Sequence, residues 1–290
     1  MSRPLSRGTW LVASSYALWG LLPLYWKALE GVDAQVVLAH RILWALVFTT
    51  VLVVVLRSGK EVLGLFRDRR KVLRMVGAAA LISVNWWLYI WAIDAGHVVE
   101  AALGYYINPL LSVLLGILFL KEKLTKLQGA AFALAAVGVV VMALGVGRIP
   151  YVALGLAFSF GFYGLLKKQA PVGALASLQI ETLFSLPLAV VLLLPSQGVF
   201  GPNPGWSTVL LLILAGPVTA VPLWLFGSGA RLIPLTRVGF LQYISPTINL
   251  ALGLWVFHES FDFWRVGAFV CIWIALVLFT IDTARRSRAT

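Results

Sequence analysis

Apolar residues fill this sequence in long, nearly uncharged blocks that are separated by short polar segments. Residues 103–120 and 127–146 contain no charged residue, and each block approaches the roughly 20 apolar residues with which a helix crosses a bilayer. A helix of that length in a soluble protein keeps a polar face. The pattern therefore predicts ten membrane-spanning helices, near residues 9–26, 34–56, 72–95, 98–120, 125–145, 149–168, 172–194, 207–229, 235–257 and 262–282. The longest segments outside them, 57–71 and 195–206, are expected to be loops.

The basic residues orient these spans. Of the 23 lysines and arginines, Arg41 lies within a span, and only Lys27, Arg148 and Arg265 fall on one side of the membrane, which leaves nineteen on the other. Because cytoplasmic loops carry an excess of Lys and Arg, both termini are predicted to be cytoplasmic. The net charge of +12 would suit a nucleic-acid binder, but these charges lie in short loops between apolar blocks. We expect instead a multi-pass protein of the bacterial inner (plasma) membrane, with no nucleic-acid partner.

The chain contains an internal repeat. A shift of 137 residues places Tyr106, Pro109, Gly116 and Glu122 on Tyr243, Pro246, Gly253 and Glu259, and a shift of 144 places Ser15 and Gly20 on Ser159 and Gly164. Five spans per repeat is an odd number, so the second repeat enters the membrane from the opposite side. The predicted fold is an all-α integral membrane protein of two inverted five-helix repeats, residues 1–147 and 148–290. Many secondary transporters share this architecture and bind substrate where the repeats meet.

Polar side chains form matching stripes on two of the predicted spans. Residues three and seven positions apart share a helix face, and the shift of 137 superimposes the two stripes: Tyr105, Asn108 and Ser112 on Gln242, Ser245 and Asn249. Each stripe has a proline, Pro109 or Pro246, that is expected to kink its helix. One interpretation is that the stripes line a central cavity; the other is that they only hold helices together.

Further polar and aromatic pairs occur within the spans. The remaining candidates for substrate binding are Ser15, Trp19, Asn85, Tyr89, Ser159, Tyr163 and Trp224. Interfacial belts explain Trp and Tyr at helix ends, but Trp19 lies near a span centre. A cavity lined by such rings would suit a flat or a cationic ligand.

Arg41 and Glu181 are the strongly charged residues predicted to lie well inside spans, and His40 adjoins Arg41. An intramembrane charge is a functional hypothesis by default. Three roles are open: an ion pair between the repeats, binding of a substrate carboxylate by Arg41, and transfer of a coupling proton by Glu181. Asp94, His97 and Glu100 cluster in an expected outer loop, where a solvated loop is favoured over a metal site. We expect no metal and no cofactor.

Several segments resemble the RarD branch of the EamA family, within the drug/metabolite transporter superfamily. They are Ser15-Tyr16-Ala17-Leu18-Trp19-Gly20, His40-Arg41-Ile42, Gly104-Tyr105-Tyr106-Ile107-Asn108-Pro109 and Gln242-Tyr243-Ile244-Ser245-Pro246-Thr247. The resemblance covers nearly the whole chain, although Ala45 and Ala102 depart from the pattern of the branch. It implies ten helices in a 5+5 inverted repeat, and export of small metabolites or drugs.

These observations together predict a secondary-active transporter of a small metabolite or drug-like molecule. It would be an exporter that works by alternating access through a central polar and aromatic cavity, with coupled protons as one energy source. The alternatives are a membrane-embedded enzyme and a non-transporting sensor or subunit. An enzyme would need clustered acid–base or metal-binding groups, and the spans contain no such cluster, so we expect no enzymatic activity.

Overall fold

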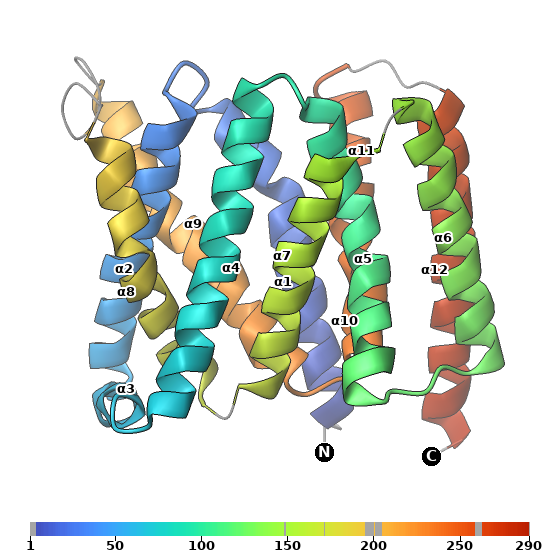
Figure 1. Ribbon diagram of the computed structural model, residues 1–290, viewed down its shortest axis with the longest axis horizontal. Coiled ribbons are helices and arrows are strands. Elements are labelled where there is room, and N and C mark those ends of the chain that lie inside the picture. The colour runs from blue at the N-terminus through green and yellow to red at the C-terminus, as the bar shows by residue number, and fades with distance from the viewer. Residues whose placement is uncertain are drawn as a thin grey trace.

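The computed structural model describes residues 4–147, 149–170, 172–194, 200, 205–258 and 263–289, and the regular structure in these residues is entirely helical. The helices are α1 (Pro4–Lys27), α2 (Ala34–Val55), α3 (Gly59–Leu65), α4 (Arg69–Asp94), α5 (Val98–Leu120), α6 (Lys126–Val146), α7 (Tyr151–Gln169), α8 (Ala174–Leu193), α9 (Trp206–Ala230), α10 (Leu235–Gln242), α11 (Ile244–Trp255) and α12 (Phe263–Ala289). They stand side by side, and α1 begins at the end of the bundle where α12 ends (Figure 1). We call this the terminal end.

Helical segments cover all the predicted spans, with two differences. Residues 57–71, expected to form a loop, contain α3. This helix is too short to show an apolar period. Its buried Leu65 packs among Met75 and Ala176. Its Glu61 accepts a hydrogen bond from the backbone N–H of Gly173, the N-cap residue of α8 (2.7 Å). The predicted span 235–257 is broken into α10 and α11. The other expected loop, 195–206, lies mostly outside the described residues.

The break between α10 and α11 follows from Pro246. Proline has no backbone N–H and its ring displaces the carbonyl four residues earlier, which here belongs to Gln242, the last residue of α10. Pro109 occupies the corresponding place in α5, which stays helical from Val98 to Leu120. Of the two equivalent prolines, Pro109 therefore lies in a continuous helix, and Pro246 lies just after a break.

The surface of the bundle is that of a membrane protein. Seven helical segments of the described chain are long and apolar enough to cross a bilayer: Ala34–Val55, Arg69–Ile93, Val98–Leu120, Lys126–Gly145, Ala174–Leu193, Trp206–Ala230 and Val266–Thr283. Large apolar side chains such as Val54, Leu118, Leu144 and Val277 are more than half exposed. Water would oppose such exposure and lipid would not, so the chain is a multi-pass membrane protein.

Close helix crossings at glycines set the geometry of the centre. A Cβ on Gly216 of α9 would overlap the backbone of Trp44 in α2, and a Cβ on Gly239 of α10 would lie 2.6 Å from the Pro109 carbonyl oxygen in α5. Both contacts join a helix of the first half of the chain to one of the second half. They bring the two halves together around one central space.

Candidate functional site

A cavity of about 180 Å³ lies between the two halves of the chain. Its lining begins midway along α1 and reaches Trp26 near the last turn, and it includes Arg41 in the first half of α2. The cavity therefore occupies the half of the bundle away from the terminal end. It is lined by Tyr16, Trp19, Leu22, Pro23, Trp26, Arg41, Ile82, Asn85, Trp86, Tyr89, Ala101, Gly104, Tyr105, Asn108, Leu156, Phe160, Thr219, Leu223, Gln242, Ser245, Pro246 and Asn249.

Many of the residues selected from the sequence lie on this lining. They are Trp19, Arg41, Asn85, Tyr89, Tyr105, Asn108, Gln242, Ser245, Asn249 and the kink residue Pro246. The whole α10–α11 stripe faces the cavity. The α5 stripe faces the cavity only through Tyr105 and Asn108. Ser112 is buried against Gly239 of α10, where a Cβ added to the glycine would lie 3.2 Å from the Ser112 Cβ.

The other selected residues do not line the cavity, and they contact neighbouring side chains or backbone groups. The Ser15 hydroxyl donates to the Pro222 carbonyl (2.8 Å), which joins α1 to α9. Ser159 accepts a hydrogen bond from the cavity residue Asn85 (2.9 Å). Trp224 packs on the apolar core, and the His40 ring accepts a hydrogen bond from Trp44 (3.0 Å). Pro109 lies at the α5–α10 crossing.

Arg41 is the charged residue of the lining. Its Nε donates to the Thr219 hydroxyl (3.1 Å), and its guanidinium carbon lies over the rings of Trp26 and Trp86, 4.8 and 5.2 Å from their centroids. Within the described parts of the chain no carboxylate pairs with it. The ion pair with Glu181 that the sequence left open is not formed.

Two amide groups on the lining have unused hydrogen-bonding capacity. The Oδ1 atoms of Asn108 in α5 and Asn249 in α11 are buried and make no hydrogen bond with the residues described. Asn85, in contrast, donates to the Leu156 carbonyl and to Ser159, both at 2.9 Å. Buried polar atoms are usually satisfied, so the two orphan oxygens point to a bound water or ligand.

Aromatic rings close the cavity toward the terminal end. The Trp19 ring lies 5.7 Å from both the Phe160 and the Phe226 ring, and Tyr16 lies 5.4 Å from Trp19. Tyr163 stacks on the far side of Phe226 (6.1 Å). Tyr16 and Phe160 were not selected from the sequence, because a chain with so many aromatic residues gives no signal for which rings meet.

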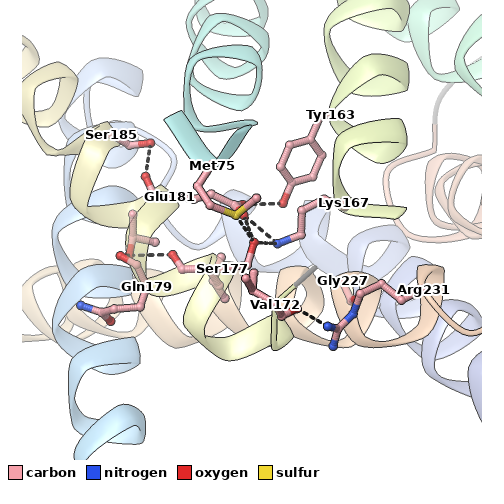
Figure 2. A network of polar contacts seen from close by, with 12 residues as sticks. Met75, Tyr163, Lys167, Val172, Ser177, Gln179, Glu181, Ser185, Gly227 and Arg231 are labelled. Carbon is pink, nitrogen blue, oxygen red and sulfur yellow. Dashed lines mark hydrogen bonds and ion pairs between the residues drawn. The ribbon is translucent and has the colours of Figure 1, made fainter. Parts of the chain in front are cut away.

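A buried ion pair lies beyond this aromatic floor. Lys167 and Glu181 are each 2% exposed and their charged atoms are 2.7 Å apart. The Tyr163 hydroxyl also donates to Glu181 (3.1 Å), and Ser177 bridges Glu181 and Met75. Figure 2 shows these side chains converging from α4, α7 and α8. From the sequence, Lys167 was counted among the basic residues of the cytoplasmic side, because its position at the end of the predicted span 149–168 does not reveal that its side chain turns inward.

Two further carboxylates join helices rather than meeting solvent. Glu100, expected in a solvated loop, is 1% exposed and accepts a hydrogen bond from the Val152 N–H near the start of α7 (3.3 Å). Glu122 accepts from the N–H groups of Leu235 and Thr236 at the start of α10 (2.7 and 2.8 Å). Carboxylates stabilise helix N-termini. The two ends of α5 are thus tied to the second half of the chain; the counterpart of Glu122, Glu259, lies outside the described residues.

The chain matches a family of transporters over most of its length. The family model described as "EamA-like transporter family" matches residues 6–144 and 149–281. The chain is 50% identical to "Uncharacterized transporter YojE" of Bacillus subtilis over 98% of its own length and 97% of that protein. It is 45% identical to "Protein RarD" of Streptomyces exfoliatus (95% and 89% covered) and 39% identical to "Protein RarD" of Escherichia coli K12 (98% and 97% covered).

A solved structure has the same fold. The structure titled "Crystal structure of protein" matches with a TM-score of 0.74 at 19% identity, over 95% of this chain and 98% of that one. At this identity the likeness concerns the fold alone.

Proposed function

The chain belongs to the RarD branch of the EamA-like transporter family, and on that premise we propose that it is a secondary-active exporter of a small metabolite or drug-like molecule. The observation that carries the proposal is the central cavity. First-half helices α1, α2, α4 and α5 and second-half helices α7, α9, α10 and α11 all contribute to its lining. A polar and aromatic space between the two halves suits a carrier.

We further propose ten spans in two inverted repeats, residues 1–147 and 148–290, with both termini in the cytoplasm of a bacterial cell. Under the internal repeat, α1 corresponds to α7, α4 to α9 and α5 to α10–α11. The packing supports this: α1 contacts α9 and α11, just as α7 contacts α4 and α5. Helices α2 and α8, which also correspond, pack on each other, as do α6 and α12.

The proposed mechanism is alternating access. With the terminal end in the cytoplasm, the cavity lies in the outer half of the bundle, and we take the aromatic floor around Trp19 and Phe226 as the inner barrier. An inward-facing state requires that this floor separate and that α5 and α7 rearrange. The orphan oxygens of Asn108 and Asn249, one from each half, would then contact the substrate in both states.

Leucine at Asn108 or Asn249 is expected to lower export about tenfold or more without preventing membrane insertion. The change removes a hydrogen-bonding group whose loss typically costs 1–3 kcal/mol, and it adds no charge. Untargeted mass spectrometry of medium and cytosol would compare the parent with each variant at equal membrane abundance. Thr280→Leu, on the exposed side of α12, is the control. Full export by both asparagine variants would contradict the cavity as the transport site.

We retain Glu181 as the candidate carrier of a coupling proton, because its carboxylate is buried between Lys167 and Tyr163 below the cavity floor. Glu181→Gln cannot exchange that proton, so the dependence of export on the pH gradient is expected to flatten. Export of a metabolite found by the profiling experiment would be followed at two external pH values. Glu61→Gln, which keeps an acceptor for the Gly173 N–H, is the control. An unchanged pH dependence in Glu181→Gln removes Glu181 from this role.

A further inference from the structure

In the described part of the chain, no carboxylate pairs with Arg41 to neutralise its positive charge in the cavity. Its Nε is used by Thr219, and its guanidinium carbon lies over the faces of two tryptophan rings. The two terminal nitrogens of the guanidinium therefore have no acceptor within the described part of the chain. A charge at membrane depth without a partner is costly and usually marks a functional site.

The two tryptophans hold the guanidinium in place but do not neutralise it. Trp26 comes from α1 and Trp86 from α4, so Arg41 of α2 is restrained from two other helices. Cation–π contact attracts a charge without cancelling it. A restrained guanidinium with its terminal nitrogens unused is suited to bidentate binding of a planar carboxylate.

The charge of the ligand follows from the rest of the lining. Arg41 is the one Lys or Arg among the lining residues, which also include no Asp or Glu. A phosphate monoester would bring a second negative charge that no lining cation could meet. A cationic ligand would be repelled by the Arg41 charge, which already occupies the faces of Trp26 and Trp86. The cavity is thus matched to a single negative charge, and not to the cationic ligand that was one of the two expectations from its aromatic content.

The orphan amide oxygens add a second requirement. Asn108 is 5% exposed, and its Oδ1 atom and that of Asn249 are buried without a donor. An unsatisfied buried acceptor is costly, and a hydroxyl or N–H group on the ligand would satisfy either oxygen after a small side-chain rotation that exposes it to the cavity. The aromatic rings of Trp19 and Phe160 leave apolar surface for the ligand body.

We propose that the cavity binds a small organic monocarboxylate that carries at least one hydrogen-bond donor. Its carboxylate binds Arg41 between Trp26 and Trp86, and its donor binds Asn108 or Asn249. This assignment rests on the proposed function only in taking the cavity as the transport site; the binding itself can be measured without transport.

Three probes with one skeleton test the assignment on the purified full-length protein. They are 3-phenyllactate, which has the charge and the donor, 3-phenylpropionate, which has the charge alone, and 3-phenyllactamide, which has the donor without the charge. Binding is measured by quenching of tryptophan fluorescence and by the shift of the thermal midpoint. We expect affinity to fall at least tenfold from 3-phenyllactate to its amide and several-fold to 3-phenylpropionate. Equal binding of acid and amide, or no binding of either acid, overturns the proposal.

Variants then assign the two contacts. Arg41→Gln is expected to abolish the preference for acid over amide, and Arg41→Lys to keep part of it. Either Asn108→Leu or Asn249→Leu is expected to abolish only the preference for 3-phenyllactate over 3-phenylpropionate. The midpoint without probe reports whether each variant is folded, and the comparison of probes on the parent does not depend on any variant. A preference that survives Arg41→Gln overturns the proposal.

A transport measurement distinguishes binding of the carboxylate in the cavity from its export by the protein. Proteoliposomes loaded with labelled 3-phenyllactate would show efflux if both hold. Arg41-dependent binding without any efflux would support the site and count against the carrier. Efflux of other metabolites with no selective acid binding would support the carrier and overturn the site.

Discussion

Lys167→Met is expected to destabilise the protein by about 3–5 kcal/mol, the usual cost of removing one member of a buried ion pair. Glu181 would be left at 2% exposure with only hydroxyl groups, those of Tyr163 and Ser177, as partners. It must then either hold an uncompensated buried charge or take up a proton, and both cost free energy. These hydrogen bonds cannot replace a cation 2.7 Å away. The measurement is the free energy of unfolding, or the thermal midpoint, of the purified protein in detergent micelles.

The double variant Lys167→Met/Glu181→Gln tests the reason for that loss. It removes both charges and keeps an amide oxygen that can accept from Tyr163 and Ser177, so most of the stability lost in Lys167→Met should return. Replacing a buried ion pair by uncharged groups is often close to neutral. The neighbouring Lys168 is the matched control, because it is only partly buried and donates to the Ile233 carbonyl (2.6 Å). Equal losses in Lys167→Met and Lys168→Met would show that burial of the pair has no special energetic role.

The sequence predicted the helices well because lipid imposes a simple rule. A segment that crosses hydrocarbon must satisfy its own backbone, which favours long apolar helices that composition reveals. The prediction fails where another contact decides the structure. Helix α3 depends on Leu65 packing against residues far away in sequence. The sequence marks Pro246 and the equivalent Pro109 alike, yet the helix is interrupted near Pro246 and α5 stays continuous through Pro109.

The candidate site was predicted in part, for a related reason. Helical periodicity places Tyr105, Asn108 and Ser112 on one face, but it cannot say how far along that face the cavity extends. The cavity ends before Ser112, because Gly239 packs closely against that residue. Side-chain direction at a helix end is equally hidden, so Lys167 was counted only as a cytoplasmic basic residue and its pairing with Glu181 was missed. Which residues meet across the bundle is settled only by tertiary packing.

Gly216→Ala is expected to reverse the usual effect of this substitution. In an open helical position, alanine is favoured over glycine by about 1 kcal/mol, but here the new methyl group would overlap the Trp44 backbone and lie 2.5 Å from its carbonyl oxygen. A backbone cannot turn aside as a flexible side chain can. Helices α2 and α9 would have to separate, and overpacking of this kind typically costs 1–3 kcal/mol.

The same separation would reach the cavity, which gives the prediction a second readout. Trp44 lies one turn after Arg41 on α2, and Arg41 is held to α9 through Thr219, one turn after Gly216. Gly216→Ala is therefore expected to lower both the thermal midpoint and export. The control is Gly129→Ala in α6, where no atom lies within 4 Å of the new methyl group. This variant should lower neither the thermal midpoint nor export. If the two variants were equally stable, the α2–α9 contact would not fix the spacing of these helices. A stable Gly216→Ala with reduced export would instead mean that the spacing matters for positioning Arg41 and contributes little to folding.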